Sequence, residues 1–222
     1  MEVKEINIAH IAQVCIENVF RTSTAKPGYV HLNFGKNLSS TEFRSIMVDL
    51  KNELSKFTTK QFNSTLAYHW LVRFDQQVNT PFHLDNAEDQ SFLMLGYEPS
   101  EVDSELYLAD YVKYANDSKV ESTECIEKIT PIFKEDESLL APYVTKVSSF
   151  NSDTYRIVFI NNSKPKSFPE MLGVFHKVLI VRPDVTKSRI VNSMILNLLP
   201  KGIINKNEPS EEAFLNTDII SK

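Results

Sequence analysis

From Ser64 onward the chain alternates side chains with a period of two, and this pattern constrains the fold more than any other feature. In "STLAYHWLVRFDQQV" one set of alternate positions is entirely apolar: Leu66, Tyr68, Trp70, Val72 and Phe74. Successive side chains of a β-strand point to opposite faces, so the stretch predicts a strand with one apolar face.

Six shorter runs of the same character follow, at "SFLMLGY", "SELYLADY", "APYVTKVSSF", "TYRIVFI", "GVFHKVLIV" and "RIVNSMILNLL". Turn-forming clusters such as "NNSKPKS" and "PDVTKS" separate several of them. The sequence therefore predicts a mainly β fold of seven or eight strands, an antiparallel β-sandwich or jelly roll.

A helical segment precedes the strands and is expected to support the sheet. In "SSTEFRSIMVDLKNELSKF", Ser39 and Glu42 have the spacing of a capping box. Six apolar residues of this segment share one helical face: Phe43, Ile46, Met47, Leu50, Leu54 and Phe57. We expect an α+β arrangement in which helix packs against the sheet.

The length of 222 residues and the 42% hydrophobic content suit one domain over 1–222. We divide it into a helical part at about 1–60, a β core at about 64–200 and a polar tail at about 201–222. A polar insert with some helix is expected around 112–140. The tail would be disordered, a lid over the site, or a cover for a sheet edge.

Composition argues against several classes of function. The net charge of -5, without a basic run, argues against nucleic acid as a partner. The five glycines form no G-x-G or Walker pattern, which argues against dinucleotide and P-loop chemistry. Cys15 and Cys125 form no metal-binding or redox motif. The N-terminus does not read as a signal peptide and no apolar run reaches about 20 residues, so we expect a cytoplasmic protein without a membrane segment.

The stretch "TPFHLDNAEDQS" contains the first candidate for chemistry. His83 and Asp85 are two positions apart, so in an extended segment both side chains point to one side. An imidazole nitrogen and a carboxylate oxygen suit Fe(II), Mn(II) or Zn(II). The alternative is a strand-to-turn junction in which Asp85 caps local amides.

The second candidate lies in "GVFHKVLIVRPDVTKSRIVNS", which we interpret as an antiparallel hairpin across "PDVTKS". His176 is near the start of its first strand, and Arg189 opens the second. Both side chains are placed to face one cavity, where an arginine can hold a carboxylate through two parallel hydrogen bonds. The alternatives are a core histidine and a solvent-exposed arginine.

The combination of "HLD", the distal histidine in "GVFHKV" and the basic residue in "SRIVNS" resembles the iron(II)- and 2-oxoglutarate-dependent dioxygenases, whose fold is a double-stranded β-helix. The resemblance covers about residues 66–197. It implies that His83, Asp85 and His176 bind iron and that Arg189 binds the distal carboxylate of 2-oxoglutarate. The family often has Ser or Thr two residues after that arginine. Here that position is Val191, and Ser193 follows as a possible further contact to the cosubstrate, while Arg182 is the competing anchor.

The resemblance also implies a reaction in which dioxygen and 2-oxoglutarate give succinate, carbon dioxide and a hydroxylated substrate. Related halogenases have a small residue in place of the aspartate, so Asp85 favours hydroxylation. The expected substrate is a small molecule or an amino-acid side chain, and a protein or peptide substrate is possible. The sequence does not predict the oligomeric state.

Two other functions stay open from the sequence. One is a cupin-like barrel that binds a metal or ligand without 2-oxoglutarate, and the other is a non-catalytic binding module. Around the site, His69 and Arg73 share a face of the strand that leads into "HLD" and are candidates for the pocket lining, with surface or barrel-packing roles as the alternatives. Trp70 and Tyr68 are expected in the core, whereas Tyr97 and Tyr107 are candidates for the cavity border.

Overall fold

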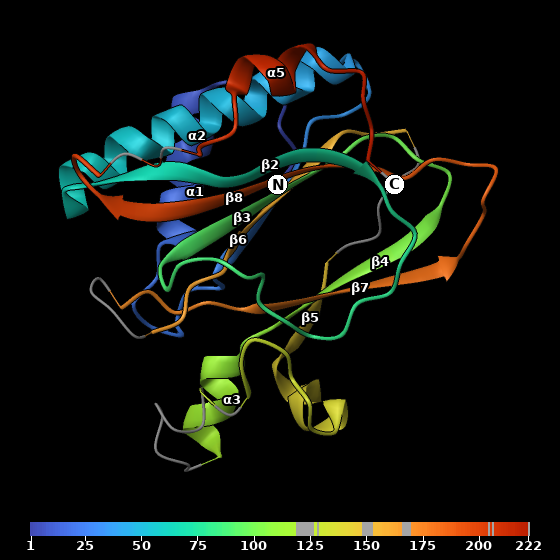
Figure 1. Ribbon diagram of the computed structural model, residues 1–222. Coiled ribbons are helices and arrows are strands. Elements are labelled where there is room, and N and C mark those ends of the chain that lie inside the picture. The colour runs from blue at the N-terminus through green and yellow to red at the C-terminus, as the bar shows by residue number, and fades with distance from the viewer. Residues whose placement is uncertain are drawn as a thin grey trace.

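Two antiparallel β-sheets face each other in the computed structural model, with helices on the outer side of the larger sheet (Figure 1). The structure describes residues 1–118, 127, 129–147, 153–165, 170–203, 205 and 207–221. The larger sheet has five strands in the order β1-β6-β3-β8-β2: β1 Tyr29–Asn33, β6 Arg156–Asn161, β3 Ser91–Tyr97, β8 Ile190–Pro200 and β2 Ser64–Asp75. The smaller sheet has three in the order β5-β4-β7: β5 Val144–Lys146, β4 Asp103–Ala109 and β7 Phe175–Arg182. The prediction of a mainly antiparallel β fold with helical support is confirmed at this level.

The predicted amphipathic helix is α2, Ser40–Phe62. Ser39 is its N-cap, and the capping box with Glu42 is present as the sequence predicted. The apolar face of α2 packs with α1, Ile8–Val19, and with the outer face of the larger sheet, in one core cluster that includes Phe43, Leu50 and Phe92. Burying this face is what holds both helices against the sheet.

The N-terminal part contributes a strand as well as helices, which the sequence interpretation omitted. Strand β1 pairs with β6 at one edge of the larger sheet, with Tyr29 opposite Ile160 and Asn33 opposite Arg156. A strand of five residues, Tyr29–Asn33, is too short to give a clear periodic signal in the sequence.

The predicted hairpin between the last two long strands is wrong. Strand β7 pairs with β4 in the smaller sheet, whereas β8 pairs with β2 and β3 in the larger sheet. The connection at 183–189 therefore passes from one sheet to the other. Alternation in the sequence predicts which face of a strand is buried but not which strand it pairs with. Two consecutive strands are therefore expected to pair as a hairpin even when they belong to different sheets.

The C-terminal tail covers the edge of the larger sheet at β2. Ser221 forms a parallel bridge with Phe74: the Asp75 N–H donates to the Ser221 carbonyl at 2.9 Å, and the Ser221 N–H donates to the Arg73 carbonyl at 3.0 Å. Helix α5, Glu211–Asn216, buries Phe214 against the core shared with α2. Of the three roles expected for the tail, the edge cover is the one observed in its described residues, and it satisfies edge groups that would otherwise be open to pairing.

The described part of the insert around 112–140 contains helix, as expected, and also buries apolar side chains. It contains α3, Tyr111–Asp117, and the 3-10 helix η1, Glu137–Tyr143. Both contribute to a second apolar cluster, which includes Phe133 and Leu140 and lies against the smaller sheet. Cys125 lies outside the described residues. Among the residues that are described, no helix combines the length and apolar character needed to cross a membrane.

Candidate metal centre

The segment between β2 and β3 carries His83 and Asp85 along strand β7 of the smaller sheet. The Thr80 N–H donates to the Val178 carbonyl at 3.0 Å. His83 and His176 then exchange two backbone hydrogen bonds, each of 3.0 Å, as directly opposed antiparallel residues. This pairing places the two imidazole rings side by side, with 4.1 Å between ring centroids.

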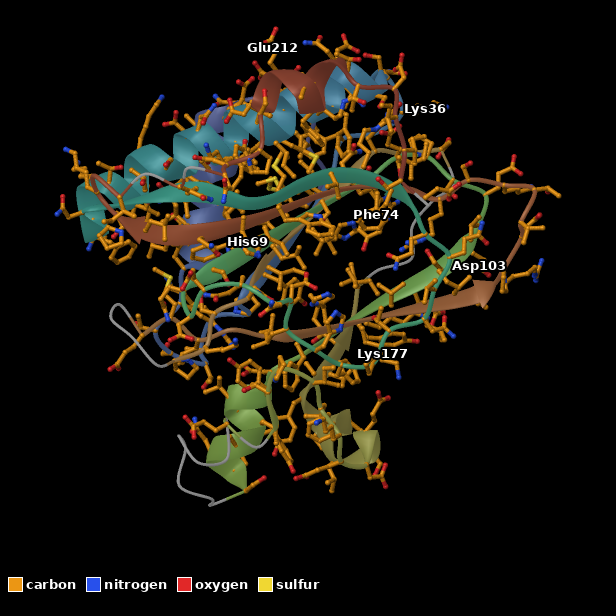
Figure 2. The ribbon with its side chains drawn as sticks, viewed as in Figure 1. Lys36, His69, Phe74, Asp103, Lys177 and Glu212 are labelled. Atoms are coloured by element: carbon orange, nitrogen blue, oxygen red, sulfur yellow. The ribbon has the colours of Figure 1, made fainter. Side chains whose placement is uncertain are left out.

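The extended conformation predicted for "FHLD" is present and sorts its side chains by face. Phe82 and Leu84 are buried in the second apolar cluster, with 4% and 2% of their surface exposed. His83 and Asp85 point the other way, to the cavity between the sheets. The same alternation on β7 puts His176 on the cavity side, while Lys177 lies on the outer side and pairs with Glu137 (Figure 2).

Three potential ligand atoms converge, one from each of His83, Asp85 and His176. His83 Nε2 is 3.5 Å from Asp85 Oδ1, and His176 Nε2 is 3.8 Å from Asp85 Oδ2. One ligand atom of each residue lies within 4.8 Å of the other two. Within the described part of the chain, this is the one group of three or more His, Cys, Asp or Glu residues with the spacing of a metal site.

The hydrogen bond of His83 sets its tautomer in favour of metal binding. Its Nδ1 lies 2.8 Å from the Pro81 carbonyl oxygen. A carbonyl can only accept, so Nδ1 carries the proton and the neutral ring holds its lone pair on Nε2, the atom nearest Asp85. Backbone carbonyls are common outer partners of metal-binding histidines. His176 differs, because its Nδ1 is buried and has no hydrogen-bond partner among the described residues.

Burial and mutual charge set the protonation of the three groups. Burial lowers the pKa of His176 to about 4, so this ring is neutral and can donate a lone pair. Burial opposes ionisation of Asp85, but the hydrogen bond from His83 and the charges of both histidines lower its pKa below the usual value. Burial favours the neutral form of His83, yet its hydrogen bonds to Asp85 and Pro81 raise its pKa overall. Near neutral pH Asp85 is therefore a carboxylate and His176 a neutral imidazole, while the contacts of His83 with Asp85 and Pro81 favour its protonated form when no metal is bound.

The donor set fits a divalent transition metal. Two ligand atoms on one ion, with bonds of about 2.1 Å, are about 3.0 to 3.5 Å apart. The His83–Asp85 separation of 3.5 Å is at the edge of that range, and the three ligand atoms, all within 4.8 Å of one another, reach it with side-chain movements of about 1 Å. Two imidazoles and one carboxylate on one side of an ion leave positions free on the other side, which is the arrangement of non-haem Fe(II) sites that bind further ligands.

The free side faces a cavity of about 420 Å³ between the two sheets. Its lining comes from both sheets and from the segment after β2: His69, Trp70, Phe74, Gln76, Thr80, His83, Asp85, Asn86, Leu95, Tyr97, His176, Val178, Arg189, Val191, Ser193 and Ile195. The prediction that His176 and Arg189 face one cavity is confirmed, although they reach it from opposite sheets.

Arg189 is buried in this cavity, with 5% of its surface exposed. Its Nε donates to Ser104 Oγ at 3.0 Å, and Nη1 donates to the Gln76 carbonyl at 3.1 Å. The guanidinium carbon lies 5.1 Å from the centroid of the Tyr97 ring. Arg189 also hydrogen bonds to Tyr97, and together these contacts hold the plane of the guanidinium in place.

The other predicted residues of this region divide between cavity and surface. Ser193 and Val191 both line the cavity together with Arg189. Arg182, the competing anchor, is exposed and is not part of the lining. Tyr97 borders the cavity as expected, whereas Tyr107 does not and instead hydrogen bonds to Glu105.

A β-bulge in β2 overturns two further expectations. Tyr68 pairs with Leu196 and Trp70 with the adjacent Ile195, so His69 is an extra residue in β2. His69 therefore faces the cavity, while Arg73 lies on the opposite face of the sheet in an ion pair with Glu98. Trp70 lines the cavity with 46% of its surface exposed and is not a core residue, whereas Tyr68 is buried as predicted.

The cavity lining also includes Gln76, Thr80 and Asn86, which were not predicted. All three lie in the irregular segment around "HLD", and their proximity to the motif was the available signal.

No family model matches this chain, and a search of curated proteins returns no match either.

Proposed function

We propose that this protein is an Fe(II)- and 2-oxoglutarate-dependent oxygenase that hydroxylates an unactivated C–H bond of a small molecule or an amino-acid side chain. One observation carries the proposal: two histidines and a carboxylate converge on the wall of a cavity that also contains a buried arginine. A metal site alone would suit many functions. A buried cation in the same cavity adds the requirement for an anionic ligand, and 2-oxoglutarate meets it.

The strand order supports a jelly roll of the double-stranded β-helix type for this chain. Along the sequence, β2 belongs to the larger sheet, the segment around His83 lies along the smaller sheet, β3 is in the larger, β4 and β5 in the smaller, β6 in the larger, β7 in the smaller and β8 in the larger. This repeated crossing brings strands distant in sequence to one cavity. It is the property that lets His83 and His176, 93 positions apart, face each other.

In the proposed reaction, His83, Asp85 and His176 would hold the iron on one side. Bound iron would supply the redox chemistry that couples oxidation of 2-oxoglutarate by O₂, giving succinate and CO₂, to transfer of one oxygen atom into a substrate C–H bond. Asp85 completes the ligand set as a carboxylate and reduces the net charge of the site, which favours hydroxylation over halide binding.

Arg189 would bind the distal carboxylate of 2-oxoglutarate. Its bonds to Ser104 and Gln76 already orient the guanidinium, so little ordering remains to be done on binding. Ser193 lies on the same face of β8 and is a candidate for a further hydrogen bond to that carboxylate. The apolar side chains of Val191, Leu95 and Val178 exclude water around the cosubstrate and strengthen these interactions.

The test is anaerobic addition of Fe(II) and then 2-oxoglutarate to the purified protein, followed by visible spectroscopy. We expect a charge-transfer band that requires both additions, and succinate formation once O₂ is admitted. Asp85→Ala should abolish the band, while Asp49→Ala, on the exposed face of α2, serves as the matched carboxylate control and should retain it. A wild-type protein that neither forms the band nor produces succinate would refute the proposal.

The same experiment distinguishes the oxygenase from the alternative function, a cupin-like barrel that binds a metal without 2-oxoglutarate. That function is favoured by the metal-ligand geometry alone, without a role for Arg189. It predicts that the protein binds a divalent metal with the three residues but that 2-oxoglutarate changes neither the spectrum nor the stability of the loaded protein.

A further inference from the structure

The β-bulge in β2 presents two consecutive side chains to the same cavity. Before the bulge, Tyr68 pairs with Leu196, which is buried on the helix-covered face of the sheet. After it, Trp70 pairs with Ile195, which lines the cavity. The extra residue, His69, also lines the cavity. Bulges re-aim side chains next to active sites, and here the bulge places an imidazole beside an indole.

Neither side chain has a partner within the described part of the chain. The indole N–H of Trp70 makes no hydrogen bond there, and its ring stacks on no other ring. The ring nitrogens of His69 likewise make no hydrogen bond with the described residues. Figure 2 shows His69 and Phe74 on the side of β2 that faces the smaller sheet. Trp70 lines the cavity and keeps 46% of its surface exposed, so its large aromatic surface is open to a ligand that enters the cavity.

The cavity separates this pair from Arg189. Trp70 is opposite Ile195, and Arg189 precedes Ile195 by six positions along β8, roughly 20 Å at the rise of an extended strand. The carboxylate of the cosubstrate would occupy the arginine end. The opposite end, with His69, Trp70 and Ile195, is left for the substrate.

Charge at this end favours a neutral ligand. Among the described residues that line the cavity, Asp85 is the only carboxylate, and a bound metal would neutralise it. Of the lysines and arginines that the structure describes, Arg189 alone is in the lining, and it lies at the far end. A cationic or anionic substituent would therefore lose hydration near Trp70 without gaining a counter-charge.

We infer that His69 and Trp70 form the substrate-positioning subsite, which binds a neutral aromatic group carrying a hydrogen-bonding substituent. The ring stacks on the indole of Trp70, and the substituent bonds to the imidazole of His69. As a statement about the reaction this rests on the proposed function, but binding at the subsite does not require turnover.

Trp70 is the only tryptophan in the chain, so its indole N–H gives one resonance that reports directly on the subsite. The probe is benzamide, titrated into ¹⁵N-labelled protein with and without Zn(II) and 2-oxoglutarate. We expect a saturable shift of that resonance and an affinity about three- to tenfold higher than that of cyclohexanecarboxamide, which carries the same amide on a ring that is not flat.

Variants separate the two contacts, with binding measured from ligand signals. Trp70→Leu should remove the preference for the flat ring, whereas Trp70→Phe should retain it. His69→Ala should weaken benzamide about three- to tenfold and leave fluorobenzene, which lacks the amide, unchanged. Val185→Ala is the control, because Val185 is 99% exposed outside the cavity, and it should change neither affinity.

Equal affinities for the two amides, or no saturable shift of the indole resonance, would overturn the inference. Tighter binding of benzylammonium or benzoate than of benzamide would overturn the assignment of a neutral ligand. The two proposals fail separately: benzamide bound at Trp70 without the Fe(II) and 2-oxoglutarate band refutes the oxygenase and leaves the subsite standing. A charge-transfer band in a protein that does not bind benzamide refutes the subsite and leaves the oxygenase proposal standing.

Discussion

Replacing Arg189 by methionine tests whether this residue recognises the distal carboxylate of 2-oxoglutarate. Methionine keeps much of the length of the side chain and removes the charge and all donors. Two charge-assisted hydrogen bonds to a carboxylate contribute roughly 3 kcal/mol or more together. At about 1.4 kcal/mol per factor of ten, the dissociation constant of 2-oxoglutarate should rise about 100-fold. Arg189→Lys keeps the charge but not the paired geometry, so we expect a rise of about tenfold.

The assay is anaerobic titration of the Fe(II)-loaded protein with 2-oxoglutarate, compared with 2-oxopentanoate. The second compound has the same carbon chain and the same metal-binding end but lacks the distal carboxylate. Wild type should prefer 2-oxoglutarate strongly, and Arg189→Met should bind the two compounds with nearly equal affinity. This comparison isolates the interaction between Arg189 and the carboxylate from any general damage to the site.

Stability requires its own control, because Arg189 also bonds to the protein. Its removal leaves Ser104 Oγ and the Gln76 carbonyl without their donor, at a cost of about 1–3 kcal/mol in the free energy of unfolding. Ser104→Ala measures part of that cost with the arginine present. Arg182→Met is the matched control, because Arg182 is exposed seven positions earlier and should not affect 2-oxoglutarate. If Arg182→Met weakened binding and Arg189→Met did not, the assignment of the anchor would be refuted.

Three further predictions concern the scaffold. Gly96→Ala should lower the free energy of unfolding by about 1–3 kcal/mol in urea denaturation, because a Cβ there would lie 2.4 Å from Met47 Sδ. Adding Met47→Ala should recover part of that loss. A Gly96→Ala variant with unchanged stability would contradict this packing. Burial raises the pKa of Cys15 to about 12. In a Cys125→Ser variant, a thiol reagent at pH 8 should therefore label Cys15 only as fast as the protein unfolds. Rapid labelling would show that the Cys15 thiol is accessible in the folded protein. Burial and the nearby charges of Arg156 and the N-terminus lower the pKa of His31 to about 4, so its contribution to stability is present above pH 6.5 and is lost as the pH falls toward 4. In His31→Gln the free energy of unfolding should depend less on pH between 6.5 and 4. An unchanged pH profile would contradict the lowered pKa of His31.

Local patterns in the sequence predicted those features that depend on neighbouring residues. The capping box at Ser39 and Glu42 forms because its two hydrogen bonds join residues three apart. The orientation of His83 and Asp85 away from Phe82 and Leu84 follows from the alternation of a strand, wherever that strand lies.

The bulge at His69 shows where such patterns fail. The alternation of apolar residues continues unbroken through Tyr68 and Trp70, so the sequence gives no sign of an extra residue between their partners. Contacts from the tail lie at this point: the Tyr68 N–H donates to Glu208 at 2.7 Å, and Asn205 donates to the Tyr68 carbonyl at 3.0 Å. Residues more than 130 positions away thus bond the backbone of β2 beside the bulge, and no local period encodes such contacts.

By itself, the sequence determined the strand and helix periods, the helix cap and the side to which each candidate ligand points, because these depend on the geometry of a few consecutive residues. Tertiary structure alone decided that β7 and β8 belong to different sheets, that Trp70 faces the cavity beside His69, and that Arg189 is buried while Arg182 is exposed. Those outcomes depend on which strands pair across the whole chain. The free energy gained by burying one face of a strand comes from contacts with many residues, so no single residue specifies its pairing partner. The triad of His83, Asp85 and His176 needed both: alternation to aim the side chains, and the pairing of His83 with His176 to bring them together.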